Sequence, residues 1–110
     1  MKIKNNTSHT LVTPNEPLLS NFMDTFKLQY HTIKNNHLLV DLTSLEPIKA
    51  KELNKLVKWA SQSRSLKKSF IVIVKNISVD DVSEQLICVP TLLEAKDTLE
   101  MEEMERDLGF

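Results

Sequence analysis

The apolar positions along this chain follow two spacings, which predict strands alternating with helices. Short runs that are almost entirely apolar are typical of strands buried on both faces of a parallel sheet, whereas apolar residues recurring every three or four positions predict amphipathic helices. Strands are expected at 2–5, 9–13, 37–42, 70–74 and 86–89, and helices at 17–36, 50–60 and 91–109. The turn-forming residues 6–8 lie between the first two strands and indicate an opening hairpin.

Residues at the helix ends support these boundaries. Asn15 is a candidate cap for the first helix, and Pro17 suits a first helical position, where a missing N–H costs nothing. Thr91 and Glu94 match the capping box that opens a helix, and Gly109 is the expected stop of the last one.

This order of elements predicts an α/β fold. Alternating strands and helices imply right-handed crossovers onto a mostly parallel sheet, here with an N-terminal antiparallel hairpin and about three main helices. No repeat, low-complexity segment or linker interrupts the pattern, so residues 1–110 are expected to form a single domain.

The composition excludes several kinds of chemistry. Gly109 is the single glycine, which rules out phosphate-binding loops, dinucleotide fingerprints and nucleophile elbows built on glycine-rich turns. Cys88 is the single cysteine and lies in an apolar run, where a thiol behaves as a small hydrophobe. With no cysteine framework, signal sequence or membrane-spanning run, we expect a cytoplasmic location and no membrane association.

The titratable residues do not form a recognisable catalytic or metal-binding pattern. The histidines lack the spacing that directs two imidazoles at one metal ion, and the adjacent carboxylates 80–81 and 102–103 diverge on a loop or helix. We therefore expect a protein that is not an enzyme, with no cofactor or metal.

Charge is distributed unevenly along the chain. Residues 1–79 carry 12 Lys and Arg against five Asp and Glu, whereas residues 80–110 carry two against ten. Lys51, Lys55 and Lys58 fall on the predicted solvent face of the second helix, which makes RNA an alternative partner. A pI of 6.3 and an aromatic content of 5% argue against nucleic-acid binding.

Two apolar features leave alternatives open. Trp59 lies about 120° from the centre of the second helix's apolar stripe, so it either flanks the core or anchors a partner. In the last helix, Met101, Met104 and Leu108 form a stripe half a turn away from that of Ala95 and Leu99. Either the helix kinks or ends near residue 100, or the methionine stripe docks another protein or a second copy of the chain.

The chain resembles a known family at several of these positions. Val40-Asp41-Leu42-Thr43 ends a strand, a loop and helix follow, then comes the strand 70–74, and Val89-Pro90-Thr91 opens an acidic last helix. This arrangement resembles the STAS domain of anti-anti-sigma factors and sulfate-transporter tails, which implies a β/α superhelix with strands in sequential order and a role in protein–protein regulation. The ending 89–110 is similar to small bacterial STAS-like proteins.

Some of those proteins carry the name ribonuclease Z. That enzyme needs a His-x-His-x-Asp-His cluster to hold two metal ions, and this sequence lacks such a run. The resemblance therefore implies at most an association with a nuclease or its RNA, not the activity.

The family's phosphorylation motif is not matched. Phosphorylatable members continue after the strand into Asp-Ser-Ser/Thr-Gly, and these positions fall here on Lys49, Ala50, Lys51 and Glu52. Thr43 and Ser44 are the nearby hydroxyls that could substitute. The sequence thus predicts a degenerate STAS-like module that binds a protein partner without a phosphoacceptor serine. The predicted partner-binding residues are Thr43, Ser44, Lys49, Lys51, Lys55, Trp59, Met101, Met104 and Leu108.

Overall fold

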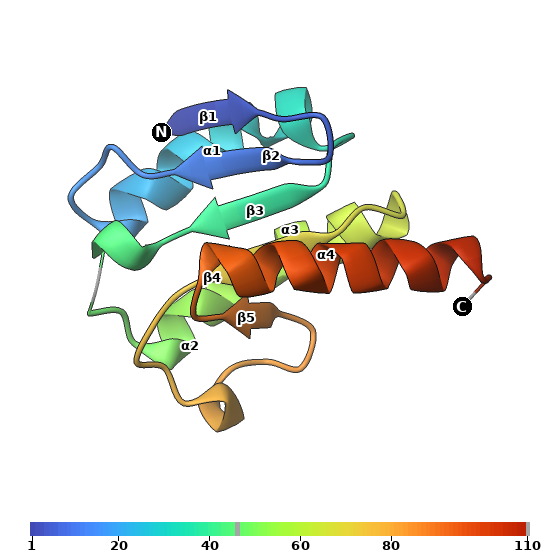
Figure 1. Ribbon diagram of the computed structural model, residues 1–110. Coiled ribbons are helices and arrows are strands. Elements are labelled where there is room, and N and C mark those ends of the chain that lie inside the picture. Colours follow the sequence, from blue (N-terminus) through green and yellow to red (C-terminus); the bar gives the residue numbers. More distant parts are fainter. Residues whose placement is uncertain (46, 110) are drawn as a thin grey trace.

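A central sheet organises the protein, and its strands lie side by side in the order in which they occur along the chain (Figure 1). The computed structural model describes residues 1–45 and 47–109. For Val79, within the second range, it describes the backbone only. Within these residues the sheet has five strands: β1 (Lys2–Asn5), β2 (Thr10–Thr13), β3 (Leu38–Asp41), β4 (Phe70–Ile73) and β5 (Ile87–Val89). β1 pairs antiparallel with β2 and every other pair is parallel, which confirms the predicted α/β fold and opening hairpin.

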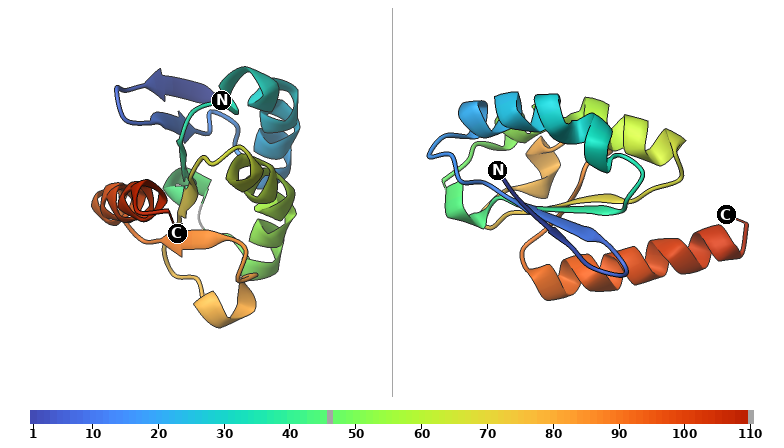
Figure 2. Two further views of the ribbon diagram at one scale, coloured as in Figure 1. Left: turned by 90° about the vertical axis from the view of Figure 1, so that its right-hand side faces the viewer. Right: turned by 90° about the horizontal axis from the view of Figure 1, so that it is seen from above.

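The helices cover the two faces of the sheet unequally. In the described part of the chain, α1 (Leu19–Ile33), α2 (Ala50–Leu53) and α3 (Val57–Ser65) lie on one face, and α4 (Leu92–Asp107) is the one helix on the other (Figure 2). A 3₁₀ turn, Asn54–Leu56, joins α2 to α3, so the predicted second helix is a nearly continuous helical segment.

The central strands are apolar throughout because both of their faces are covered. Leu38 and Val40 of β3 pack toward α1 and α3, whereas Leu39 between them packs toward α4. At the start of β4, Phe70 likewise packs toward α1 and α3, and Ile71 packs toward α4. Successive side chains of a strand point to opposite faces, so a two-sided core requires a continuous apolar run.

The apolar core under α4 is small. It consists of Leu39, Ile71 and Ile73 from the sheet with Ala95 and Leu99 from the helix, together with partly buried neighbours. α4 has its apolar contacts with the sheet in its first two turns only, and the rest of the helix must be held in another way.

The first helix starts later than the sequence pattern indicates. α1 begins at Leu19, and its N-cap Leu18 makes no side-chain cap hydrogen bond, so the predictions of Asn15 as cap and Pro17 as first helical residue were wrong. Glu16 instead contacts the amino group of Met1 at 2.8 Å and accepts the N–H of Asn15. These contacts hold residues 15–17 in an irregular segment.

The last helix is continuous from Leu92 to Asp107, so of the two alternatives the kink or end near residue 100 is wrong. Thr91 caps α4 by accepting the N–H of Glu94 at 3.1 Å, which is the N-cap half of the predicted capping box. At the other end Gly109 has a φ of +83°, a conformation that suits glycine after a helix.

Trp59 belongs to the core, so its prediction as a partner-binding anchor was wrong. Its side chain is 6% exposed, and its ring meets that of Phe26 edge-on at a centroid distance of 5.0 Å. Tyr30 adds a hydrogen bond from its hydroxyl to the Trp59 carbonyl. α1 packs against the side of α3, which makes the buried arc of α3 wider than the stripe that faces the sheet.

Candidate protein-binding surface

The outer face of α4 carries large apolar side chains that no other described part of the chain covers. Their exposed fractions range from 61% to 71%. These residues, which we call the α4 stripe, are Leu93, Met101, Met104 and Leu108. Scattered exposed apolar residues are ordinary, but several on one helix face form a patch of the kind that marks interaction sites.

The second half of α4 is reversed relative to an ordinary surface helix. Ala95 and Leu99 face the sheet, and the same helix face continues as Glu102 and Arg106 at the helical spacing of three and four. Polar side chains therefore point inward where the α4 stripe points outward. Surface helices normally place apolar residues toward the core and polar ones toward water.

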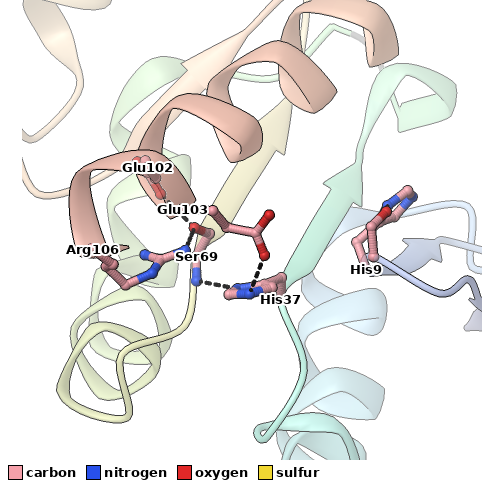
Figure 3. Close-up of polar contacts among 7 residues, drawn as sticks. His9, His37, Ser69, Glu102, Glu103 and Arg106 are labelled. Carbon is pink, nitrogen blue, oxygen red and sulfur yellow. Dashed lines mark hydrogen bonds and ion pairs between the residues drawn. The ribbon is translucent and has the colours of Figure 1, made fainter. Parts of the chain in front are cut away.

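A polar cluster holds this reversed half against the sheet (Figure 3). His37 precedes β3, and its Nε2 lies 2.9 Å from an oxygen of Glu103. Its Nδ1 accepts the backbone N–H of Ser69, which precedes β4, at 3.0 Å. A backbone N–H can only donate, so Nδ1 carries no proton and His37 is the neutral tautomer that donates from Nε2.

The Ser69 hydroxyl forms the other half of the cluster. It donates to Glu102 at 2.6 Å and accepts from the Arg106 guanidinium at 2.9 Å. Ser69 is 2% exposed, so both hydrogen bonds form largely out of water. We call His37, Ser69, Glu102, Glu103 and Arg106 the α4 latch.

The latch positions α4, and its hydrogen bonds do not pair the Ser69 hydroxyl with His37 as a catalytic serine and base. A histidine that activates a serine must accept the serine's hydroxyl proton, but here Nδ1 of His37 accepts the Ser69 backbone N–H, and the hydroxyl donates to Glu102. Burial lowers the pKa of His37, with the positive charges of Arg106 and Lys68 acting in the same direction and Glu103 opposing them. These effects keep the imidazole neutral, as its hydrogen bonds require.

Two hollows border α4, one on each side of the helix. One, of about 590 Å³, lies between the β1–β2 hairpin and α4 and includes His9, Leu11 and Lys96. The other, of about 430 Å³, lies toward the end of α3 and includes Arg64 and Glu105. Burial, and to a lesser degree Lys96, lowers the pKa of His9.

The remaining predicted binding residues lie elsewhere. Ser44, Lys49, Lys51 and Lys55 are exposed and follow the carboxyl end of β3, whereas the latch lies at the amino ends of β3 and β4. α2 and α4 also cover opposite faces of the sheet. The predicted partner-binding residues outside the core therefore lie on two separate surfaces of the protein.

Thr43 is already engaged by its own loop. Its hydroxyl donates to Asp41 at 2.7 Å and its N–H donates to the same carboxylate oxygen at 3.0 Å. Asp41 therefore shapes the turn after β3, and the Thr43 hydroxyl is held in that turn.

Sequence reasoning missed the latch, although one signal was present. Glu102 and Arg106 extend the buried stripe of Ala95 and Leu99 at unbroken helical spacing, which indicates polar residues facing inward. Nothing local to His37 or Ser69 shows that they meet, because β3 and the whole crossover to β4 lie between them in the sequence.

The described residues were searched for groups of metal ligands and for a reactive thiol. Residues 1–45 and 47–109 contain no group of three His, Cys, Asp or Glu side chains placed to hold a metal ion. Burial raises the pKa of the Cys88 thiol to about 11, so the reactive thiolate is scarce at neutral pH.

No helix in the described part of the chain is long and apolar enough to cross a membrane.

Comparison with models of known protein families gives no match for this chain, and neither does comparison with curated proteins.

Proposed function

We propose that this protein is a non-catalytic, regulatory protein-binding module of degenerate STAS-like type, with the exposed face of α4 as its main binding surface. The observation that supports this proposal is the reversed half of α4. Met101, Met104 and Leu108 point into solvent, while Glu102 and Arg106 contact Ser69 and Glu103 contacts His37. A partner that covers the α4 stripe would remove its apolar surface from water, at a gain of roughly 25 cal/mol per Å² before the costs of association.

The latch supports the proposal because it fixes the binding face in advance. Ser69 and His37 each connect the end of a loop to α4, through contacts between 2.6 and 2.9 Å with side chains of the helix. A surface that is already rigid loses less entropy when a partner binds. A mobile helix end would have to order at that moment.

The lysine at the family's acceptor position also favours a surface role. Lys51 stands where phosphorylatable relatives of the resembled type have a hydroxyl, and its side chain is exposed. Thr43, the half-buried substitute, donates its hydroxyl to Asp41. We therefore propose that regulation acts through partner binding and not through a phosphoacceptor serine.

Photo-crosslinking tests this function. A benzophenone amino acid is placed at Met104 in the full chain, at Lys51 on the other predicted surface, and at Leu28 as a matched control, since Leu28 is an exposed apolar residue on α1. We expect a discrete adduct in cells of the source organism from position 104 and none from position 28.

The other outcomes separate the parts of the proposal. An adduct from position 51 alone would keep the protein-binding function and overturn α4 as its surface. If neither position gives more adduct than position 28, the protein-binding function itself is wrong.

A further inference from the structure

Three residues of the α4 stripe, together with Asp97, have the spacing of a helix-packing seam. Asp97, Met101, Met104 and Leu108 follow one another at intervals of four, three and four residues, which is the alternation of a and d positions in a coiled coil. Leu93 extends this outer face by one turn toward the start of the helix. At 1.5 Å per residue, the face from Leu93 to Leu108 is about 22 Å long, enough for a partner helix of about four turns.

Three of the four positions that flank this seam between Asp97 and Leu108 are acidic, and the fourth is Thr98. Glu100, Glu105 and Asp107 occupy its e and g positions and are exposed. Arg106 lies on the inner side of the helix, where it donates to Ser69. The flanks therefore present negative charge on both sides of the apolar stripe, and e and g charges set which helix pairs with which.

A second copy of this chain does not satisfy such a surface. Two α4 helices packed through their stripes would bring acidic flanks against acidic flanks, and like charges across an interface oppose association. The lysine face formed by Lys49, Lys51, Lys55 and Lys58 has the opposite charge. Among the described residues, this lysine face has no exposed large apolar side chain to cover the methionines.

We propose that the α4 stripe binds one amphipathic helix of a partner protein, with an apolar stripe and with Lys or Arg on both sides of it. This inference rests on the proposed protein-binding function and names its class of partner. Met101 and Met104 supply flexible side chains that adapt to an apolar partner. Asp97, a charged residue within the seam, fixes the register by pairing with a basic residue of the partner helix, as a polar seam position does in coiled coils.

Two synthetic peptides test the inference. Both have three heptads with leucine at a and d; one has lysine at every e and g position and the other has glutamate. Binding of each labelled peptide to the full chain is measured by fluorescence anisotropy at low and at moderate salt. We expect the basic peptide to bind, with weaker affinity at higher salt, and the acidic peptide not to bind.

Three variants separate seam binding from general charge attraction. Met104→Asp makes the protein more acidic, so general attraction would tighten binding, whereas seam binding should weaken by at least tenfold. Leu28→Asp adds the same charge on α1 and should leave affinity within about twofold. Reversing the flanks with Glu100→Lys, Glu105→Lys and Asp107→Lys together should transfer binding to the acidic peptide. Circular dichroism confirms that each variant is folded.

The inference is overturned if both peptides bind equally, if Met104→Asp leaves the basic peptide's affinity unchanged or raises it, or if the protein alone dimerises through Met104. These results leave the crosslinking test unaffected. Adducts from position 104 without binding of the basic peptide would contradict this class of partner and keep the protein-binding function.

Discussion

The backbone N–H of Ser69 donates to Nδ1 of His37 at 3.0 Å, and this contact sets the protonation state of the histidine that holds α4. Protonating Nδ1 would place two N–H groups against each other. The Glu103 carboxylate on the opposite ring nitrogen favours the charged form, but burial outweighs it and lowers the pKa of His37 below its ordinary value of 6.5.

Acid is therefore expected to destabilise the protein through His37. Its pKa is lower in the folded than in the unfolded state, so below about pH 6.5 the unfolded chain binds more protons and the free energy of unfolding falls. Above that pH His37 is neutral in both the folded and the unfolded state, so this loss of stability does not occur. Urea unfolding at pH 7.5 and 5.5 measures the difference. His37→Gln keeps an acceptor without a titrating ring, so its stability should change less between the two values, and an unchanged pH dependence would contradict the role of His37.

Removing the Ser69 hydroxyl should loosen the second half of α4. Ser69→Ala deletes the group that joins Glu102 to Arg106, and the loss of such buried hydrogen bonds costs about 1–3 kcal/mol. Amide hydrogen exchange should accelerate more in residues 101–108 than in residues 92–99. The control is Ser65→Ala, which removes an exposed hydroxyl that donates to the Gln62 carbonyl. Equal effects of the two variants on α4 would argue against the latch.

The two faces of α4 should differ sharply in their effect on stability. Leu99 is 3% exposed, so Leu99→Ala is expected to lower the free energy of unfolding by about 2–5 kcal/mol. Met104 is exposed, and Met104→Gln should change stability by less than about 0.5 kcal/mol. Denaturant unfolding of both variants checks this. A large loss from Met104→Gln would mean that the methionine supports the fold.

Trp59 offers a direct optical check of the core, since it is the sole tryptophan. Its contacts with Phe26 and Tyr30 predict blue-shifted emission and weak quenching by acrylamide, both lost in denaturant. Trp59→Ala should lower the free energy of unfolding by about 3–5 kcal/mol. Emission from the native protein at the wavelength of the unfolded chain would place Trp59 on the surface.

RNA binding through the lysine face is expected to be weak. Lys49, Lys51, Lys55 and Lys58 are exposed, but the aromatic side chains within residues 1–45 and 47–109 are all buried, which leaves no base-stacking platform there. Anisotropy of labelled single-stranded and hairpin RNA should stay flat at physiological salt. Tight, salt-dependent binding that is lost in Lys51→Glu/Lys55→Glu would favour RNA over a protein partner.

Much of the fold could be read from the pattern because local signals agree with the tertiary structure. The apolar run at 70–74 anticipates β4 because a strand covered on both faces must be apolar at each position. Thr91 was recognisable because an N-cap acts within one turn of its helix. The start of α1 could not be recognised from the sequence, because Glu16, just before the helix, contacts Met1, which is distant along the chain.

The sequence by itself determined the order of the elements and the spacing that puts Met101, Met104 and Leu108 on one face of a helix with acidic residues beside them. Only the tertiary structure decided which face of α4 turns inward. Ala95 and Leu99 anchor its first turns, and Ser69 and His37 then supply polar partners to the rest. Burial of Trp59 was likewise decided by α1 packing against α3. Such contacts join residues far apart in the chain, so no local pattern specifies them.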